Sequence, residues 1–271
     1  MLDAFKAIKT YFHPIQPGVR SGDGKILYRE IQAHGPAEDF VYCFWQLKTK
    51  ERMAAPFVYR VVSDGCIDIF FHHGRLAECF VMGFCRKYTE FPLDRDFDYI
   101  GIRFFPAAFP LLFGINAREL SNESRPLSEV LPDFATWIEE TCKPDLSFPE
   151  IAALIQAKLN EAIRQTSFDF DARFFNALQL IFQHKGCIEV EEGLDTGLSP
   201  RQLRRIFNYY VGTTPKAFCN VLRFQQVLQA KPSRQSLKDN KLYLDLDFFD
   251  QAHFIKSFKR FYGATPSQAF S

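Results

Sequence analysis

The sequence has no long apolar run, no paired cysteine motif and almost no net charge. No hydrophobic stretch approaches the roughly 18 residues that a membrane span needs, and the first residues lack a charged-then-apolar signal pattern. The seven cysteines are odd in number and form no Cys-x-x-Cys pair, which favours reduced thiols over a disulfide framework. These absences predict a cytoplasmic protein with no membrane partner.

Motifs of the common enzyme classes are also missing. The sequence contains neither a glycine-rich phosphate-binding loop nor a nucleophile elbow. His72 and His73 are adjacent, so strand alternation would point them to opposite faces, and too few other histidines remain to complete a metal site. Cys79 and Cys85 lack close paired spacing and sit among apolar neighbours. We therefore predict no catalytic residue, no metal site and no cofactor.

The formal net charge of +1 hides an uneven distribution along the chain. Residues 171–271 hold 14 Lys and Arg against 9 Asp and Glu, a net charge of +5. Residues 1–170 hold 19 against 23, a net charge of −4. A basic segment attracts the phosphates of nucleic acid. Any contact with nucleic acid is therefore expected in the last hundred residues.

This basic half contains one pattern twice, 51 residues apart. Each copy starts at a capping side chain, Ser199 or Asp250, runs as an amphipathic helix and stops at a glycine, Gly212 or Gly263. A Thr-Pro pair that can begin another helix follows soon after each glycine. The apolar positions recur at helical spacing, so one face of each helix is expected to pack. They are Leu203, Ile206, Phe207 and Tyr210 in the first copy and Phe254, Phe258 and Phe261 in the second, where Ser257 is the polar exception.

The opposite face of each helix carries side chains that suit nucleic acid. Lys, Arg, Gln and Asn match the donors and acceptors of base edges and phosphates in a major groove. A cationic helix face alone is usually solvated surface, but two copies with matching caps and stops disfavour that alternative. We predict contacts to double-stranded DNA from Arg201, Gln202, Arg204, Arg205, Gln251, His253, Lys256, Lys259 and Arg260, with Arg204, Lys259 and Arg260 nearer the phosphate backbone.

Residues from about Asp171 to the C-terminus resemble the DNA-binding domain of AraC/XylS-type transcription regulators. The resemblance is carried by Leu198–Phe207 in the first copy and by Phe248–Phe254 and Phe258–Pro266 in the second. It implies two helix-turn-helix units, whose recognition helices enter successive major grooves about 34 Å apart. The other helices of this domain are expected at Ala172–His184, Ile188–Thr196, Pro215–Ala230 and Leu237–Leu246.

Residues 1–115 are expected to form a β-rich domain. Short runs of β-branched and aromatic residues, separated by turn residues, predict strands at 40–47, 57–62, 67–71 and 99–104. This spacing suggests a barrel or a sandwich. The half also resembles the cupin-like, small-molecule-sensing domain of a subset of AraC-type regulators, in Phe44–Trp45, Ser63–Ile69, Gly101–Ala108 and Glu119–Ser121. The resemblance implies a small-molecule effector as a partner.

The aromatic residues of this half fit two interpretations. Phe44, Trp45, Tyr59, Phe71 and Phe104 could line a pocket for an apolar effector. Alternating aromatic residues are equally what a core filled by side chains needs, and we favour that interpretation for most of them.

Residues 116–167 are interpreted as a helical connector, and residues 168–271 as the DNA-binding domain. Helical spacing predicts helices at Ala107–Phe113, Leu127–Cys142 and Phe148–Ile163. In the resembled family such helices often form a homodimer contact, but their apolar faces could equally pack on the sheet domain. The candidate linker is Gln165–Phe170.

The sequence therefore predicts an α+β, multidomain protein with an N-terminal cupin-like β-barrel and two C-terminal helix-turn-helix units. Its predicted function is sequence-specific regulation of transcription in response to a small-molecule effector. One alternative is a degenerate helix-turn-helix protein that acts by protein–protein interaction. That alternative rests on Tyr243 and Asp247, which stand where the family pattern has a small residue and a turn glycine. A cupin-type enzyme fused to a DNA-binding module is a third hypothesis.

Overall fold

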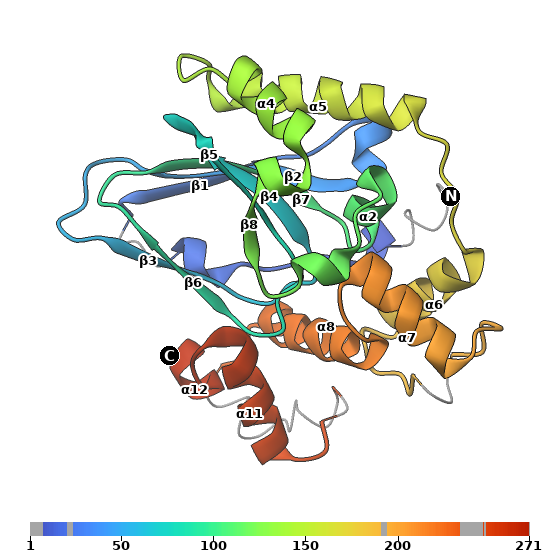
Figure 1. The fold of residues 1–271 in the computed structure, drawn as a ribbon. Coiled ribbons are helices and arrows are strands. Elements are labelled where there is room, and N and C mark those ends of the chain that lie inside the picture. The colour runs from blue at the N-terminus through green and yellow to red at the C-terminus, as the bar shows by residue number, and fades with distance from the viewer. Residues whose placement is uncertain (1–7, 21–23, 191–193, 234–245, 247, 271) are drawn as a thin grey trace.

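The computed structural model describes residues 8–20, 24–190, 194–233, 246 and 248–270. Antiparallel sheets and covering helices form the N-terminal part of the chain, and helices alone form the C-terminal part (Figure 1). The predicted α+β class is therefore confirmed. Among the described residues, no helix is both long enough and apolar enough to cross a bilayer.

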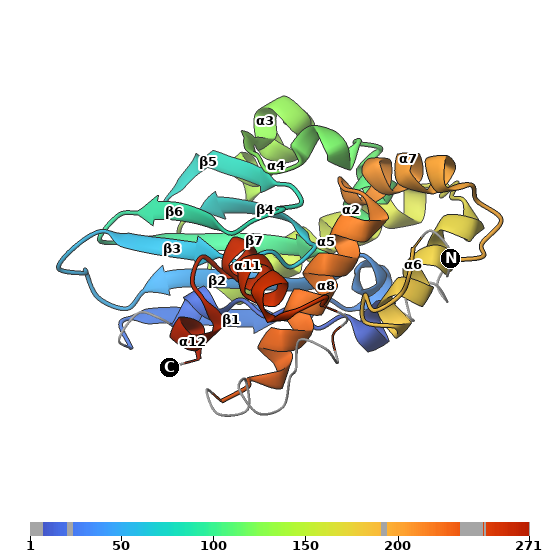
Figure 2. The ribbon, with the colours of Figure 1, turned by 90° about the horizontal axis from the view of Figure 1, so that it is seen from below.

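Two antiparallel sheets organise the N-terminal part. The larger has the order β1 (Ile26–Ile31), β2 (Val41–Thr49), β7 (Asp98–Phe104), β4 (Ile67–His72), β5 (Arg75–Met82) and β8 (Ser124–Pro126). The smaller pairs β3 (Phe57–Val61) with β6 (Thr89–Leu93) and faces the first (Figures 1 and 2). The larger sheet has β1 and β8 at its edges, so the described strands form an open two-sheet arrangement, which is the sandwich alternative and not a closed barrel.

Strand alternation gives the six-stranded sheet two different faces. In β4, Ile67, Ile69 and Phe71 belong to the core shared with the helices, whereas Asp68 and Phe70 face the smaller sheet. The helices of the covered face include α2 (Ala108–Phe113), α3 (Leu127–Val130), α4 (Pro132–Thr141) and α5 (Phe148–Gln165). Two 3-10 turns accompany them, η2 (Gly35–Asp39) between β1 and β2 and η3 (Ala117–Leu120) after α2. Phe44, Phe71 and Phe104 are buried on this side, as a plain core predicts.

Helix α5 buries one apolar face inside its own chain. Ser147 and Glu150 form a capping box at its start. Its apolar stripe, Ile151, Ile155 and Leu159, is buried in the same core cluster as the sheet's aromatic residues. The helix therefore packs on the sheet of its own chain, and these buried side chains are not available as a contact with a second copy.

The C-terminal part contains α6 (Ala172–Gln183), α7 (Pro200–Val211), α8 (Pro215–Ala230), α11 (Gln251–Tyr262) and α12 (Pro266–Ala269). The predicted helix boundaries are confirmed for α7 and α11. Ser199 accepts a hydrogen bond from the Gln202 N–H and Asp250 accepts one from the His253 N–H. Gly212 and Gly263 end the two helices at φ of 82° and 90°, a backbone region that glycine adopts without strain.

One predicted helix of this part is wrong and another cannot be compared. Within Ile188–Thr196, residues 188–190 and 194–196 have no helical structure. Ile188 and Val190, β-branched residues with low helix propensity, pack against the core instead. Nearly all of the helix predicted at Leu237–Leu246, and both Tyr243 and Asp247, lie outside the described residues.

Neighbouring residues of α5 provide a test of its packing. Ile155 is fully buried, whereas the preceding Leu154 is 37% exposed. We expect Ile155→Ala to lower the free energy of unfolding by about 2–5 kcal/mol, because the cavity it leaves lies in the core. Leu154→Ala should cost under about 1 kcal/mol. Urea unfolding followed by circular dichroism measures both, and equal losses would contradict the packing of α5 on the sheet.

Candidate functional site

The two predicted recognition helices expose their cationic faces. Leu203 and Phe207 of α7, like Phe254 and Phe258 of α11, are buried on the opposite side. All nine predicted DNA-contact side chains are exposed: Arg201, Gln202, Arg204 and Arg205 on α7, and Gln251, His253, Lys256, Lys259 and Arg260 on α11. The structure thus gathers them into two groups, one on each helix.

Three of these nine side chains form hydrogen bonds with other described residues of the chain. The Gln202 side-chain oxygen accepts hydrogen bonds from the Ser199 N–H and hydroxyl as part of the capping box. The Nε of Arg204 donates to the Pro200 carbonyl at 3.2 Å. The Nε of Arg260 donates to the backbone carbonyl of Arg86, in the N-terminal part, at 3.0 Å. Arg260 therefore lies where the second helix meets the sheet domain.

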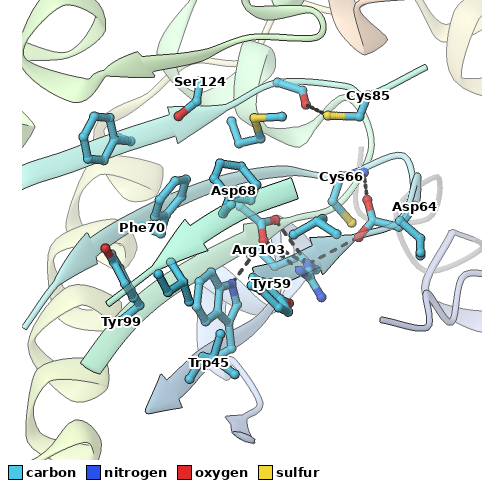
Figure 3. A pocket seen from close by; sticks show the side chains of 18 of the residues that line it. Trp45, Tyr59, Asp64, Cys66, Asp68, Phe70, Cys85, Tyr99, Arg103 and Ser124 are labelled. Carbon is cyan, nitrogen blue, oxygen red and sulfur yellow. Dashed lines mark hydrogen bonds and ion pairs between the residues drawn. The ribbon is translucent and has the colours of Figure 1, made fainter. Parts of the chain in front are cut away.

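A cavity of about 260 Å³ lies between the two sheets (Figure 3). Trp45, Asp68, Phe70 and Arg103 line it from the larger sheet, and Tyr59, Phe91 and Leu93 line it from the smaller one. Its volume is at the small end for ligand pockets, and its walls are mostly apolar with a few converging polar groups, as such pockets usually are. Of the five aromatic residues considered from sequence, Trp45 and Tyr59 line this space.

A charged cluster forms one side of the cavity. The Nη2 of Arg103 donates to Asp68 at 2.8 Å, and its Nε lies 3.1 and 3.2 Å from the two Asp68 oxygens. Asp64 lies farther off, with its Oδ2 3.7 Å from the same Nε. Only 4% of the Arg103 surface is exposed. An isolated charge at such a position would be costly, so the guanidinium depends on these carboxylates.

The register of three neighbouring strands brings Asp68, Arg103 and Trp45 together. Asp68 is directly opposite Arg103 where β4 pairs with β7, and Trp45 is opposite Gly101 where β2 pairs with β7. The Trp45 Nε1 donates to Asp68 at 3.1 Å. A Cβ on Gly101 would lie 2.2 Å from the Trp45 ring, so only glycine lets the indole lie across β7.

Burial dominates the ionisation of the cavity side chains. It raises the pKa of Asp68 from 3.8 to about 6, against the opposing effect of the Arg103 charge. Burial lowers the pKa of Arg103, but the carboxylates of Asp68 and Asp64 outweigh it and raise that pKa well above its usual value. Burial also raises the pKa of the thiol of Cys85 to about 12. The guanidinium therefore stays charged and this thiol stays protonated at neutral pH.

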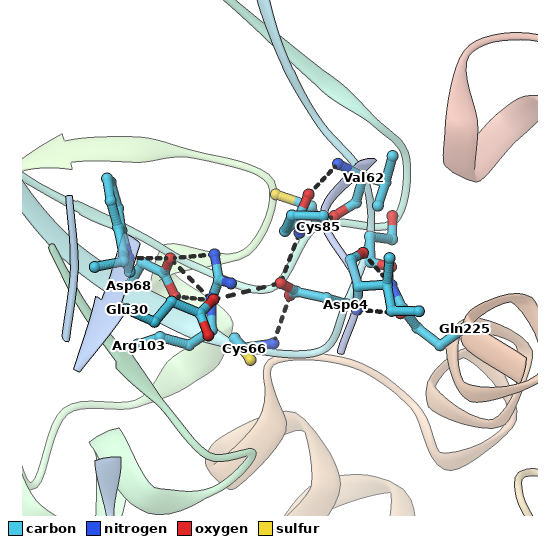
Figure 4. Close-up of polar contacts among 12 residues, drawn as sticks. Glu30, Val62, Asp64, Cys66, Asp68, Cys85, Arg103 and Gln225 are labelled. Carbon is cyan, nitrogen blue, oxygen red and sulfur yellow. Dashed lines mark hydrogen bonds and ion pairs between the residues drawn. The ribbon is translucent and has the colours of Figure 1, made fainter. Parts of the chain in front are cut away.

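The loop at one end of the cavity also holds helix α8 (Figure 4). Asp64 accepts hydrogen bonds from the Cys66 N–H at 2.9 Å and from the Gln16 amide at 2.7 Å. The Gln225 amide of α8 donates to the Ser63 carbonyl at 2.8 Å, and its oxygen accepts from the Ile15 N–H at 2.8 Å. Residues 62–66, which include cavity-lining positions, are thus in direct contact with the helix that joins α7 to the last helices.

A second loop makes a similar connection to both ends of the helical part. Gly83 and Cys85 line the cavity. Arg86, just beyond them, donates from its Nε to the Thr213 hydroxyl after α7 and accepts from the Arg260 side chain of α11. The Tyr88 N–H donates to the Arg260 carbonyl at 3.2 Å. Loop 83–88 therefore contacts the segments that follow or end both predicted recognition helices.

The sequence interpretation missed the charged cluster and both loops. The sequence predicts strands that contain Asp68 and Arg103 but does not pair the two residues, although each is a charge inside an otherwise apolar strand. Opposite charges in two such strands are a signal that could have found the pair. His73 lies near Asp98 and the Lys143 carbonyl. Within the described ranges, no group of three or more His, Cys, Asp or Glu residues is placed to hold a metal ion.

Two stretches of the chain match known protein-family models. Residues 195–271 match a helix-turn-helix domain, and residues 29–126 match a domain of unknown function (DUF6597). No curated protein matches the sequence. The C-terminal region is therefore a helix-turn-helix domain of the AraC type. The protein is a DNA-binding regulator of transcription.

Solved structures that resemble the chain include two of ToxT from Vibrio cholerae O395. One is 8% identical, with a TM-score of 0.41, and covers 91% of this chain and 97% of its own. The other, bound to (E)-4-(8-methylnaphthalen-1-yl)but-3-enoic acid, is also 8% identical, with a TM-score of 0.37, and covers 90% and 97%.

The contact between Gln225 and loop 62–66 can be tested by truncation. Gln225 is 2% exposed, so Gln225→Ala leaves the Ile15 N–H and the Ser63 carbonyl buried without this partner. We expect the free energy of unfolding to fall by about 2–3 kcal/mol. Gln226→Ala, at the next and half-buried position of α8, is the control and should change it by about 0.5 kcal/mol. Equal effects in urea unfolding would refute the role of Gln225.

The raised pKa of Asp68 predicts a pH dependence of stability. The folded state holds this proton more tightly than the unfolded chain, so the stabilisation is complete below pH 3.8 and is lost as pH rises through about 6. Relative to Asp68→Asn, which cannot titrate, the wild type should lose on the order of 2–3 kcal/mol between pH 4 and pH 7. Asp94→Asn, at an exposed position after β6, is the control. If the stability difference between the wild type and Asp68→Asn does not change with pH, the charge of Arg103 offsets the effect of burial on Asp68.

Proposed function

We propose that the protein is a sequence-specific regulator of transcription whose DNA binding responds to a small molecule held in the cavity between the two sheets. The helices α7 and α11 read the DNA, and the sheet domain senses the effector. The observation that carries this proposal is the shared use of two loops. Residues 62–66 and 83–88 both line the cavity and contact the helical part.

The side chains of α7 and α11 support direct reading of DNA. Both helices begin at a capped end and bury an apolar face. Helix α7 exposes Arg and Gln side chains, and α11 exposes Gln, His, Lys and Arg side chains. Arg205 lies in the middle of the exposed face of α7, and a guanidinium there can donate two hydrogen bonds to a guanine edge. Arg260 donates a hydrogen bond to the Arg86 carbonyl, so the side chains of α11 that would bind DNA lie beside its contact with the sheet domain.

The loops support a mechanism for the response. A ligand that shifts Asp64 or Arg103 changes the loop that accepts a hydrogen bond from Gln225. It thereby changes the relative free energies of the arrangements in which α8 is docked or released. Arg86 contacts Thr213 and Arg260, so movement of loop 83–88 also alters how α7 and α11 are presented. The effector then acts on both recognition helices at once.

Substitution of Arg205 tests the reading of DNA. The full chain is first used to select its preferred duplex from random sequences. On that duplex, Arg205→Ala should reduce affinity by about 1–3 kcal/mol and relax the preference at one base position, because a base-edge contact is lost. A phosphate contact would instead weaken all sequences alike and lower the salt slope by about one.

The matched control for this experiment is Arg164→Ala. Arg164 is an exposed arginine in the last turn of α5, so its removal changes the net charge equally but leaves α7 intact. We expect its affinity and preference to match those of the wild type. If Arg205→Ala behaves like Arg164→Ala, α7 does not read the sequence.

A further inference from the structure

The cavity has an aromatic end. The ring of Phe70 lies among four others, with its centroid 5.7 Å from Phe80, 6.0 Å from Phe91, 6.3 Å from Tyr99 and 6.4 Å from Trp45. Figure 3 shows Phe70, Tyr99 and Trp45 on the side of the cavity away from Asp64. Ring faces carry negative electrostatic potential, so a group of them favours a positive charge or an apolar body.

The polar wall carries more negative than positive charge. Its fully charged side chains are Asp64, Asp68 and Arg103, so with both carboxylates ionised their sum is −1. Arg103 directs its Nε and Nη2 hydrogen bonds to Asp68. Asp64 receives its close hydrogen bonds from neutral groups, the Cys66 N–H and the Gln16 amide, and is 3.7 Å from the guanidinium. It therefore holds a buried negative charge that is only weakly paired.

We propose that the cavity binds a small organic cation, an amine or quaternary ammonium group on a compact apolar or aromatic body. The positive group lies toward Asp64 and Asp68, and the body lies among the rings around Phe70. This assignment names the chemical class of the effector in the proposed function and rests on the cavity being its site.

Ligands of other charge fit the same geometry less well. An anion near Arg103 would meet a guanidinium whose Nε and Nη2 already bond to Asp68, and it would lie close to two carboxylates that repel it. A neutral apolar ligand would fill the space but leave Asp64 in a drier surrounding, where an unpaired charge costs more. A cation gains from the rings and from the surplus carboxylate together.

Three probes that share a benzyl group test the charge preference on the full-length protein. Benzyltrimethylammonium is the cation, neopentylbenzene replaces its nitrogen by carbon, and phenylacetate is the anion. The chain has two tryptophans. Trp137→Phe removes the one on α4 and leaves Trp45, in the cavity wall, as the reporter. We expect saturable quenching of Trp45 by the cation, with at least about tenfold higher affinity than for either other probe.

Two variants test whether Asp64 gives the cavity its preference for a cation. Asp64→Asn keeps the shape of the side chain and removes its charge, so it should reduce affinity for benzyltrimethylammonium at least about fivefold and leave neopentylbenzene unchanged. Asp94→Asn removes one carboxylate at an exposed position outside the cavity and should change neither. If neopentylbenzene or phenylacetate binds the wild-type cavity as tightly as the cation does, the proposal is overturned, and this comparison requires no substitution in the cavity wall.

The cation site and the proposed function fail in different experiments. Probe binding is measured without DNA, so a cation preference of tenfold stands whether or not α7 and α11 read a sequence. DNA affinity is then measured with and without saturating benzyltrimethylammonium. A change supports its action as an effector. Unchanged affinity removes the cavity from the regulatory function and with it the effector part of this inference.

Discussion

The pairing of Arg103 with Asp68 is the interaction on which the rest of the sheet domain depends. A guanidinium between two sheets is tolerated only where carboxylates and hydrogen-bond acceptors surround it. Asp68 occupies the directly opposite position on β4, and Trp45 completes the contact with a hydrogen bond from its indole. That hydrogen bond requires Gly101, because a larger residue would occupy the place of the indole ring. Four residues on three neighbouring strands are therefore mutually dependent.

The same pair lies beside the loop that contacts the helical part. Asp64 lies between Arg103 and the loop that holds α8, and it accepts a hydrogen bond from Gln16, which in turn bonds to both the N–H and the carbonyl of Val62. The route from the guanidinium to Gln225 thus consists of a 3.7 Å ion pair with Asp64, the hydrogen bonds of Gln16 and the hydrogen bond from Gln225 to the Ser63 carbonyl. Such networks change between discrete arrangements more readily than by gradual deformation, which suits a two-state response.

Local features of the fold could be predicted from the sequence, and contacts between distant residues could not. The ends of α7 and α11 follow from Ser199, Asp250, Gly212 and Gly263, since caps and left-handed stops act within a few residues. Strands β2, β3, β4 and β7 follow from runs of β-branched and aromatic residues. By contrast, β5 begins with Arg75 and contains Glu78, so its polar positions concealed a strand that the pairing with β4 stabilises.

The candidate site shows the same limit in physical terms. The nine side chains of the DNA-binding face needed only helical periodicity to be grouped. Prediction of the cavity would have required the register of β4 against β7. The way the described strands divide into two open sheets likewise depends on contacts between residues far apart in the sequence. The partnership of Arg86 with both Thr213 and Arg260 joins residues more than a hundred positions apart, which no local pattern encodes.

Stability alone does not account for the charged cluster. Replacing a buried ion pair by apolar residues of similar volume is often neutral or stabilising, and an apolar pair at positions 68 and 103 would let β3 and β6 close on the larger sheet. The charged side chains need polar partners, which an interdigitated apolar core does not offer. A mostly apolar space with an aromatic end lies beside this cluster and next to two loops that contact the helical part. The ion pair is thus better explained by the cavity it maintains than by the free energy it contributes to folding.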